Sequence, residues 1–387
     1  MPLATPRSWT AFFSIGFRPL YALSCAWGTL SIALWVYFPQ AIAGWLPPLY
    51  WHAHEMLWGF VASVAAGFLL TASANWTGLN PLHGKGLALL TAFWLLIRAG
   101  LLLPAEHGFY ISFGASILFY ATLTSALARV ILKASNRRNL LMPIFVAALG
   151  LSNLLFLWSA RQHEYVQLNQ FLQTGLLLMC LITLLIGRRV IPFFTHRALS
   201  GKPIPMHAKT GLLQLGLTLI AILAYWLQWP AVQASALGLI ALLVIIQAWQ
   251  WWSAPILGIP LLWILYLGWL GLAGGLLVFA AQTMGYVDNP AWSVHTLGMA
   301  GFSLLIIGML TRTSLGHLGL RLQADRWIQG MYALLFFATC LRLLALYYPA
   351  MRLPFLHSAS LCWILGLALF LWRFVPFFIR PRADGKL

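Results

Sequence analysis

The chain has 387 residues, of which 61% are apolar and only 7% are charged. Soluble globular proteins carry about 25% charged residues, so this composition excludes a soluble enzyme or a soluble binding domain. The formal net charge of +17 and the mean hydropathy of +0.85 instead predict an all-α polytopic membrane protein with basic loops, because each bilayer crossing takes about 20 apolar residues.

Hydropathy separates about twelve segments that are long enough to span a bilayer. In chain order they cover residues 17–38, 53–75, 86–103, 108–132, 140–160, 168–187, 210–228, 231–250, 259–281, 292–313, 327–348 and 355–378. These apolar runs are continuous and do not alternate with a period of two, which predicts helices rather than barrel strands. The connections are short, the longest running from Arg188 to Lys209. We therefore expect a single twelve-helix membrane domain over residues 1–387.

The basic residues are distributed unequally between the two sides of the predicted membrane. Eighteen of the 23 Lys and Arg residues fall in the termini and every second loop, whereas the alternate loops hold only Arg161 and Arg352. Cytoplasmic loops are enriched in Lys and Arg, so both termini are expected in the cytoplasm. Attraction to anionic lipid explains the net charge, and the expected partner is the bilayer rather than nucleic acid.

Histidines begin two of the predicted spans at the extracytoplasmic side. His52 and His54 open the second span and His295 opens the tenth, which predicts three imidazoles at one depth. Met56 follows His52 by four residues and Met299 follows His295 by four, so each pair shares a helix face. Imidazole binds haem iron and copper, and a thioether binds Cu(I). We predict a metal or haem site here; the alternative is that His52 and His54 are wetted interfacial side chains.

Two charged residues inside apolar runs also suggest a site. Glu55 is the only one of six acidic residues that belongs to an apolar helix, and Arg98 lies about two-thirds along the third span. An arginine in hydrocarbon needs an anionic partner or an escape to the surface. A haem propionate would supply the anion for Arg98, and snorkelling is the alternative. Glu55, beside His54, is the intramembrane carboxylate placed to relay protons and is the candidate catalytic residue.

His317 is expected beyond the cytoplasmic end of the tenth span. It follows His295 by 22 residues, which is about 33 Å at helical rise. If the helix is straight, His317 serves a separate inner site near Arg312 or is a loop histidine. A break at a glycine of this span, such as Gly308, would instead fold His317 back.

The tenth span also resembles the second one weakly. Gly67 follows His54 by thirteen residues, as Gly308 follows His295. Both of these helices run from outside to inside. Chance similarity among Leu- and Gly-rich helices is the favoured explanation.

Several short stretches together resemble the NnrS family of bacterial inner-membrane proteins. In order along nearly the whole chain they are residues 16–19, 51–56, 67–71, 75–78, 137–140, 189–195, 295–296, 309–312 and 315–317. The WHAHEM run at 51–56 and the MLTRTSLGH run at 309–317 are specific, whereas FRP and IPFF would be weak alone.

The resemblance implies a twelve-helix protein of the bacterial inner membrane that contains b-type haem and copper. It also implies a role in nitric oxide metabolism, nitrosative stress and denitrification, with nitric oxide or another small gas as partner. The residues that it implies at the cofactors are His52, His54, His295, His317, Arg18, Arg98, Arg189 and Arg312. The electron donor is not identified by any motif.

Three functions are compatible with these features. The leading one is binding or reduction of nitric oxide, because an apolar gas partitions into the bilayer and reaches a buried site laterally. A secondary transporter predicts polar groups at the midplane, whereas the polar residues here gather near the outer face. A metal or haem delivery factor for respiratory enzymes would use the same ligands in a more labile site. Whether the protein is an enzyme stays open at this point.

Overall fold

The computed structural model describes residues 8–199, 204–206 and 208–382. Within these ranges the regular secondary structure is helical, and twelve helices are long and apolar enough to cross a membrane. This confirms the predicted all-α, multi-pass membrane protein. The candidate spans are Phe17–Tyr37, Pro48–Thr77, Gly84–Leu102, Glu106–Lys133, Arg137–Arg161, Tyr165–Ala198, Lys209–Trp226, Pro230–Trp251, Pro260–Thr283, Ala291–His317, Arg326–Tyr347 and Pro349–Phe378.

Two of the spans extend well past their predicted cytoplasmic ends. The sixth, helix α8 (Tyr165–Ala198), continues eleven residues past Gly187, so Arg188, Arg189 and Arg197 are helical and do not begin a long loop as predicted. The tenth continues to His317, which is therefore helical too. Hydropathy marks where a helix leaves hydrocarbon, whereas backbone hydrogen bonding carries the helix further.

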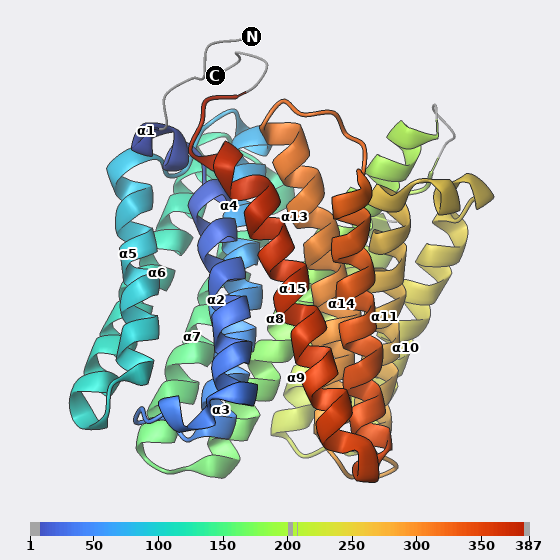
Figure 1. Cartoon of the computed structure of the whole chain (residues 1–387). Coiled ribbons are helices and arrows are strands. Elements are labelled where there is room, and N and C mark those ends of the chain that lie inside the picture. The colour runs from blue at the N-terminus through green and yellow to red at the C-terminus, as the bar shows by residue number, and fades with distance from the viewer. Residues whose placement is uncertain (1–7, 200–203, 207, 383–387) are drawn as a thin grey trace. The chain divides into compact units, whose positions relative to one another are not determined.

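The chain divides into two compact units. The first comprises Met1–Leu176, Thr313–Leu322 and Leu367–Leu387, and the second comprises Leu177–Arg312 and Gln323–Gly366. Helices α8, α13 (Leu304–His317) and α15 (Arg352–Phe378), labelled in Figure 1, each contain residues of both units. The single domain that the sequence suggests stays a prediction.

The first unit is a set of antiparallel neighbours with close backbone contacts. Its main helices are α2 (Phe17–Tyr37), α4 (Ala62–Thr77), α5 (Gly84–Leu102), α6 (Ala105–Lys133) and α7 (Leu141–Arg161). Helix α2 packs on α4, α5 on α6, and α6 on α7. A side chain at Gly100 of α5 would meet the α6 backbone at Gly108 and Ser112. Small residues at such contacts let membrane helices approach closely.

The second unit packs in the same way. It contains α9 (Ala208–Trp226), α10 (Pro230–Trp251), α11 (Pro260–Thr283), α14 (Arg326–Tyr347) and most of the tenth and twelfth spans. Helix α10 packs on α9 and α11, and α11 packs on the tenth span. Gly268, Gly271 and Gly275 lie along one side of α11, where a Cβ atom would collide with the backbone of the tenth span. These glycines bring the two helices together.

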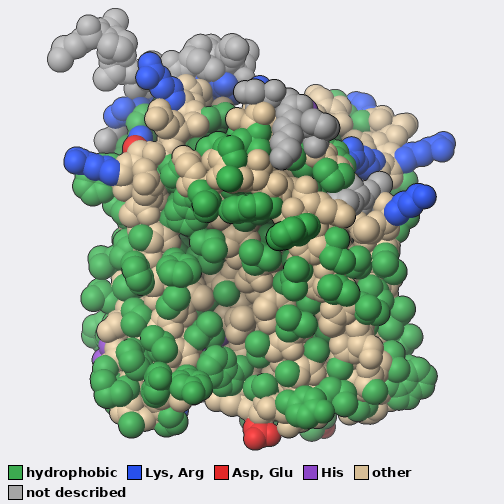
Figure 2. Space-filling model, turned by 90° about the vertical axis from the view of Figure 1, so that its right-hand side faces the viewer, with side chains coloured by type: hydrophobic (Ala, Val, Ile, Leu, Met, Phe, Trp, Pro, Cys, Tyr) green, Lys and Arg blue, Asp and Glu red, His purple; other side chains and the backbone are tan. Residues whose placement is uncertain are grey.

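The exterior of the helices is apolar. Large exposed hydrophobic side chains recur along α9 and α10, among them Leu212, Leu223, Leu239 and Leu242. On the face shown in Figure 2, hydrophobic side chains cover the middle, and the Lys and Arg side chains gather at one end. An apolar belt beside a basic end is the surface expected of helices that cross a bilayer.

The second and tenth spans share an unusual internal build. In the second, the π-helix η2 (Glu55–Val61) separates α3 (Pro48–His54) from α4. In the tenth, the π-helix η5 (Thr296–Ser303) separates α12 (Ala291–His295) from α13. Each π segment starts directly after a histidine that the sequence singles out. π-helical turns are rare overall, but those that occur are often at functional sites. The two spans are therefore similar in their local structure as well as in the spacing of their residues.

Candidate functional site

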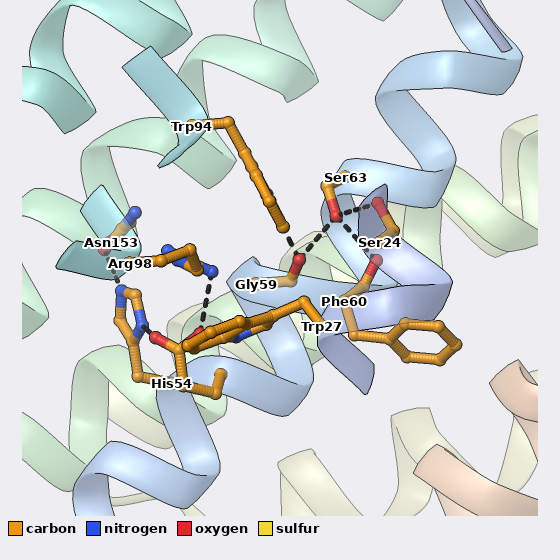
Figure 3. A network of polar contacts seen from close by, with 10 residues as sticks. Ser24, Trp27, His54, Gly59, Phe60, Ser63, Trp94, Arg98 and Asn153 are labelled. Carbon is orange, nitrogen blue, oxygen red and sulfur yellow. Dashed lines mark hydrogen bonds and ion pairs between the residues drawn. The ribbon is translucent and has the colours of Figure 1, made fainter. Parts of the chain in front are cut away.

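Glu55 is the centre of a buried polar network in the first unit. The residue is 0% exposed. Its Oε2 lies 3.0 Å from Nη1 of Arg98 on α5, and its Oε1 lies 3.0 Å from Nδ1 of His54 on α3 (Figure 3). Trp27 on α2 donates its indole N–H to Oε2. Three helices thus converge on one carboxylate.

Arg98 has an anionic partner within the protein. The sequence predicts a haem propionate as the partner of Arg98; the structure shows an ion pair with Glu55, and a cofactor role for Arg98 stays a prediction. The guanidinium also lies 5.3 Å from the ring centre of Trp94. Nε and Nη1 make no well-aligned hydrogen bond, so the charge of Glu55 stabilises Arg98 mainly through Coulomb attraction. The sequence could not reveal this pairing, because the two residues lie on different helices.

His54 has partners at both ring nitrogens. Nδ1 faces Glu55, and Nε2 lies 3.0 Å from Oδ1 of Asn153 on α7. The rings of Trp58 and Phe156 flank the imidazole at centroid distances of 5.4 and 5.8 Å. Metal ligation by His54 would require that one of these hydrogen bonds break. The structure therefore places His54 within the network, and its expected role as a ligand stays a prediction.

Gly59 lies where the π-helix touches the ion pair. Its carbonyl oxygen accepts hydrogen bonds from the Trp94 indole at 3.2 Å and the Ser63 hydroxyl at 2.5 Å. Ser63 in turn shares a hydrogen bond of 2.7 Å with Ser24 of α2 (Figure 3). A Cβ atom on residue 59 would collide with the Arg98 guanidinium and the Glu55 carboxylate. Glycine is thus required for the network to close.

The substitution Gly59→Ala should destabilise the protein by about 1–3 kcal/mol, because overpacking forces buried groups apart. A matched control is Gly114→Ala on α6, where an added Cβ atom meets nothing within 4 Å. Thermal unfolding in detergent, followed by tryptophan fluorescence, should give a lower midpoint for Gly59→Ala alone. Equal midpoints for the two variants would contradict the close approach described here.

Some members of the network were not predicted from the sequence. Asn153 had a usable signal, because it is an amide inside the apolar run 140–160 and polar groups at membrane depth are costly. Trp27, Trp94 and Gly59 had none, since such residues are common in membrane helices. Their roles follow only from how α2, η2 and α5 pack.

His52 and Met56 lie beside this network in the first unit. The His52 ring stacks on Trp35 with centroids 4.9 Å apart and an interplanar angle of 6°. Met56 is half-buried and lies within η2. The prediction that His52 and Met56 share a helix face rests on the residue spacing of an α-helix. Met56 lies in the π-helix η2, which has more residues per turn, so that spacing does not apply there.

His295 and Met299 belong to the second unit. Nδ1 of His295 lies 2.7 Å from the carbonyl oxygen of Ala291, so the N–H donates there and Nε2 carries the lone pair. This tautomer is the usual one for a metal-binding imidazole. Helix α14 packs on α12 and η5, and its Arg342 has a buried Nη1 without a hydrogen-bond partner. Met299 is half-buried in η5.

The residues around His295 have the chemistry that could hold a haem. An imidazole with its lone pair on Nε2 suits an axial haem ligand, and the unsatisfied donor of Arg342 suits a propionate. Across the described residues, His, Cys, Asp and Glu side chains form no group of three or more that could hold a metal ion. The predicted site at His52, His54 and His295 takes residues from both units and stays a prediction.

Arg18 and His317 both belong to the first unit. Nη1 of Arg18 donates to the carbonyl oxygens of Ala11, Phe378 and Arg380, at 2.8, 3.0 and 2.8 Å. The ring of His317 lies 5.6 Å from that of Phe17. In the structure Arg18 binds the chain's own backbone, and its expected cofactor role stays a prediction. Because Ala291–His317 is one continuous helix, the alternative in which His317 folds back toward His295 is wrong.

The remaining predicted arginines lie in the second unit. Arg312 on α13 stacks over the ring of Phe194 on α8, with its guanidinium carbon 3.7 Å from the ring centre. Arg189 lies on the same helix as Phe194. Neither position is explained by the Glu55 network.

Comparison with known proteins agrees with these motifs. No curated protein matches the sequence. The family model described as NnrS protein matches residues 11–382. The match includes every candidate residue above and covers nearly the whole chain. The chain therefore belongs to the NnrS family.

Proposed function

We propose that the protein is a b-type haem protein of the bacterial inner membrane that binds nitric oxide and reduces it. The observation that carries this proposal is the Glu55 network, a hydrogen-bonded carboxylate, imidazole and guanidinium buried among apolar helices. Ionisable groups at membrane depth are expensive and are a functional hypothesis by default. Membership of the NnrS family supports the same function, because the resemblance implies haem and a role in nitric oxide metabolism.

In this proposal His295 and Arg342 hold the haem. His295 presents its Nε2 lone pair because Nδ1–H is bonded to Ala291, and Arg342 offers its unsatisfied Nη1. When bound, haem supplies a metal centre for the gas and for electron transfer. Copper remains a prediction of the resemblance, and no step below depends on it.

The network would supply protons. Reduction follows 2 NO + 2 e⁻ + 2 H⁺ → N₂O + H₂O, so each turnover needs two protons inside an apolar protein. The contacts from Asn153 through His54 to Glu55, each of 3.0 Å, form a continuous hydrogen-bonded chain. A proton can pass between His54 Nδ1 and Glu55 Oε1 without exposure to lipid. Glu55 is in this proposal the proton-relaying residue.

The surroundings are compatible with an apolar gas. Nitric oxide dissolves in the bilayer and reaches buried residues between helices, so no polar channel is required. The electrons come from a one-electron donor at the membrane. The excess of Lys and Arg in alternate loops predicts that both termini are cytoplasmic. In that topology Glu55 and His295 would each lie nearer the periplasmic end of its own span.

Nitric oxide consumption by the purified protein tests this function. The protein in detergent is given ascorbate with a redox mediator in an anaerobic cell, and nitric oxide and nitrous oxide are both measured. We expect one N₂O for every two NO consumed. Haem-loaded protein that consumes no nitric oxide above the protein-free rate would contradict reduction, and the delivery or transport functions would then be favoured.

A further inference from the structure

The cytoplasmic half of the second unit contains a buried cation that no acidic side chain neutralises. Arg312 on α13 is only 8% exposed, and no carboxylate of the described residues makes an ion pair with it. Its Nε is buried without a hydrogen-bond partner. A buried unpaired charge is costly, so an arginine in this state indicates a missing anion.

The acidic residues of this unit are committed elsewhere. The second unit contains two, Asp288 and Asp325. Asp325 caps the start of α14 by accepting the backbone N–H groups of Trp327 and Ile328. Asp288 lies in the connection before α12, at the opposite end of the tenth span from Arg312. The anion must therefore come from outside the unit.

The surroundings of Arg312 leave its buried Nε without a hydrogen-bond partner. The guanidinium stacks on Phe194, and stacking holds the plane while its N–H donors point outward around the edge. Arg197 lies one turn beyond Phe194 on α8, is exposed, and is close enough to add its charge to that of Arg312. Tyr332, whose hydroxyl lies 2.6 Å from Thr311 Oγ1, is also close enough to interact electrostatically with this arginine.

We propose that Arg312, with Arg197 and Phe194, binds an oxyanion of the phosphate class at the cytoplasmic end of the second unit. A planar guanidinium edge matches two oxygens of a phosphate, and exposed Arg197 connects the buried donor to the surface. The oxyanion comes either from an anionic lipid headgroup or from free phosphate. The site is separate from the proposed haem, because Arg312 follows His295 by 17 residues of one continuous helix, or about 25 Å.

The test measures stabilisation by phosphate and by lipid. Purified full-length protein is placed in phosphatidylcholine nanodiscs, and its thermal midpoint is followed while inorganic phosphate is added. A second set of nanodiscs contains phosphatidylglycerol without added phosphate. We expect one of these additions to raise the midpoint, and its identity distinguishes free phosphate from lipid. No shift from either addition would overturn the proposal.

Matched variants separate this site from general effects of charge. Arg312→Met should raise the concentration of phosphate or anionic lipid that gives half of the midpoint shift by about tenfold or more. This is the loss of affinity expected when a charge-assisted hydrogen bond is removed. Arg312→Lys should raise that concentration less. Arg326→Met is the control, because Arg326 is an exposed arginine that also lies over an aromatic ring, that of Trp327. Equal responses of Arg312→Met and Arg326→Met would overturn the proposal. If Arg312→Met does not fold, Arg312→Lys and Phe194→Leu provide the same comparison.

Discussion

Replacing Arg98 by methionine should destabilise the protein by about 3–5 kcal/mol, the usual effect of removing one partner of a buried ion pair. The Glu55 carboxylate would keep its charge at 0% exposure while losing the cation at 3.0 Å. The effect should appear as a large drop in the thermal midpoint in detergent. It should exceed that of Arg161→Met, whose ion pair with Glu106 lies at the surface and is worth at most about 1 kcal/mol.

A double variant separates lost charge from lost packing. Combining Arg98→Met with Glu55→Gln removes both charges together, and replacing a whole buried ion pair is often close to neutral. The double variant should therefore be more stable than Arg98→Met alone. If the two have the same midpoint, the carboxylate does not depend on Arg98 and the described network is wrong.

The second large effect concerns haem retention. His295→Ala should remove nearly all bound haem, because Nε2 of this residue would bind the haem iron. His54→Gln should keep the haem, since both ring nitrogens of His54 are bonded within the network. The haem-to-protein ratio after purification measures both. Haem lost from His54→Gln but kept in His295→Ala would reverse the assignment of the two histidines.

Sequence alone predicted the spans well because membrane crossing depends on a local property, the length of an apolar run. It placed Glu55 and Arg98 inside those spans for the same reason. It could not pair them, because pairing depends on how η2 meets α5. The π-helix at Glu55–Val61 has no sequence signature, and so the close contact of Gly59 with the ion pair was not anticipated.

The arginines illustrate the same limit in another way. The sequence predicts Arg18, Arg98 and Arg312 as cofactor-binding residues, whereas the structure gives them three different environments. Arg18 binds backbone carbonyls, Arg98 binds Glu55, and Arg312 stacks on Phe194. A motif identifies a residue as special, whereas the partner depends on residues far away in the chain.

The central claim, that this membrane protein carries haem, is tested most directly by the visible absorption spectrum of the native protein. The protein should be purified in mild detergent, and its haem content measured by pyridine haemochrome. We predict a Soret band with b-type haem bound to the protein, reduced by ascorbate with a mediator and shifted by nitric oxide. Protein that is folded, expressed with ample haem supply and free of haem absorption would contradict the account.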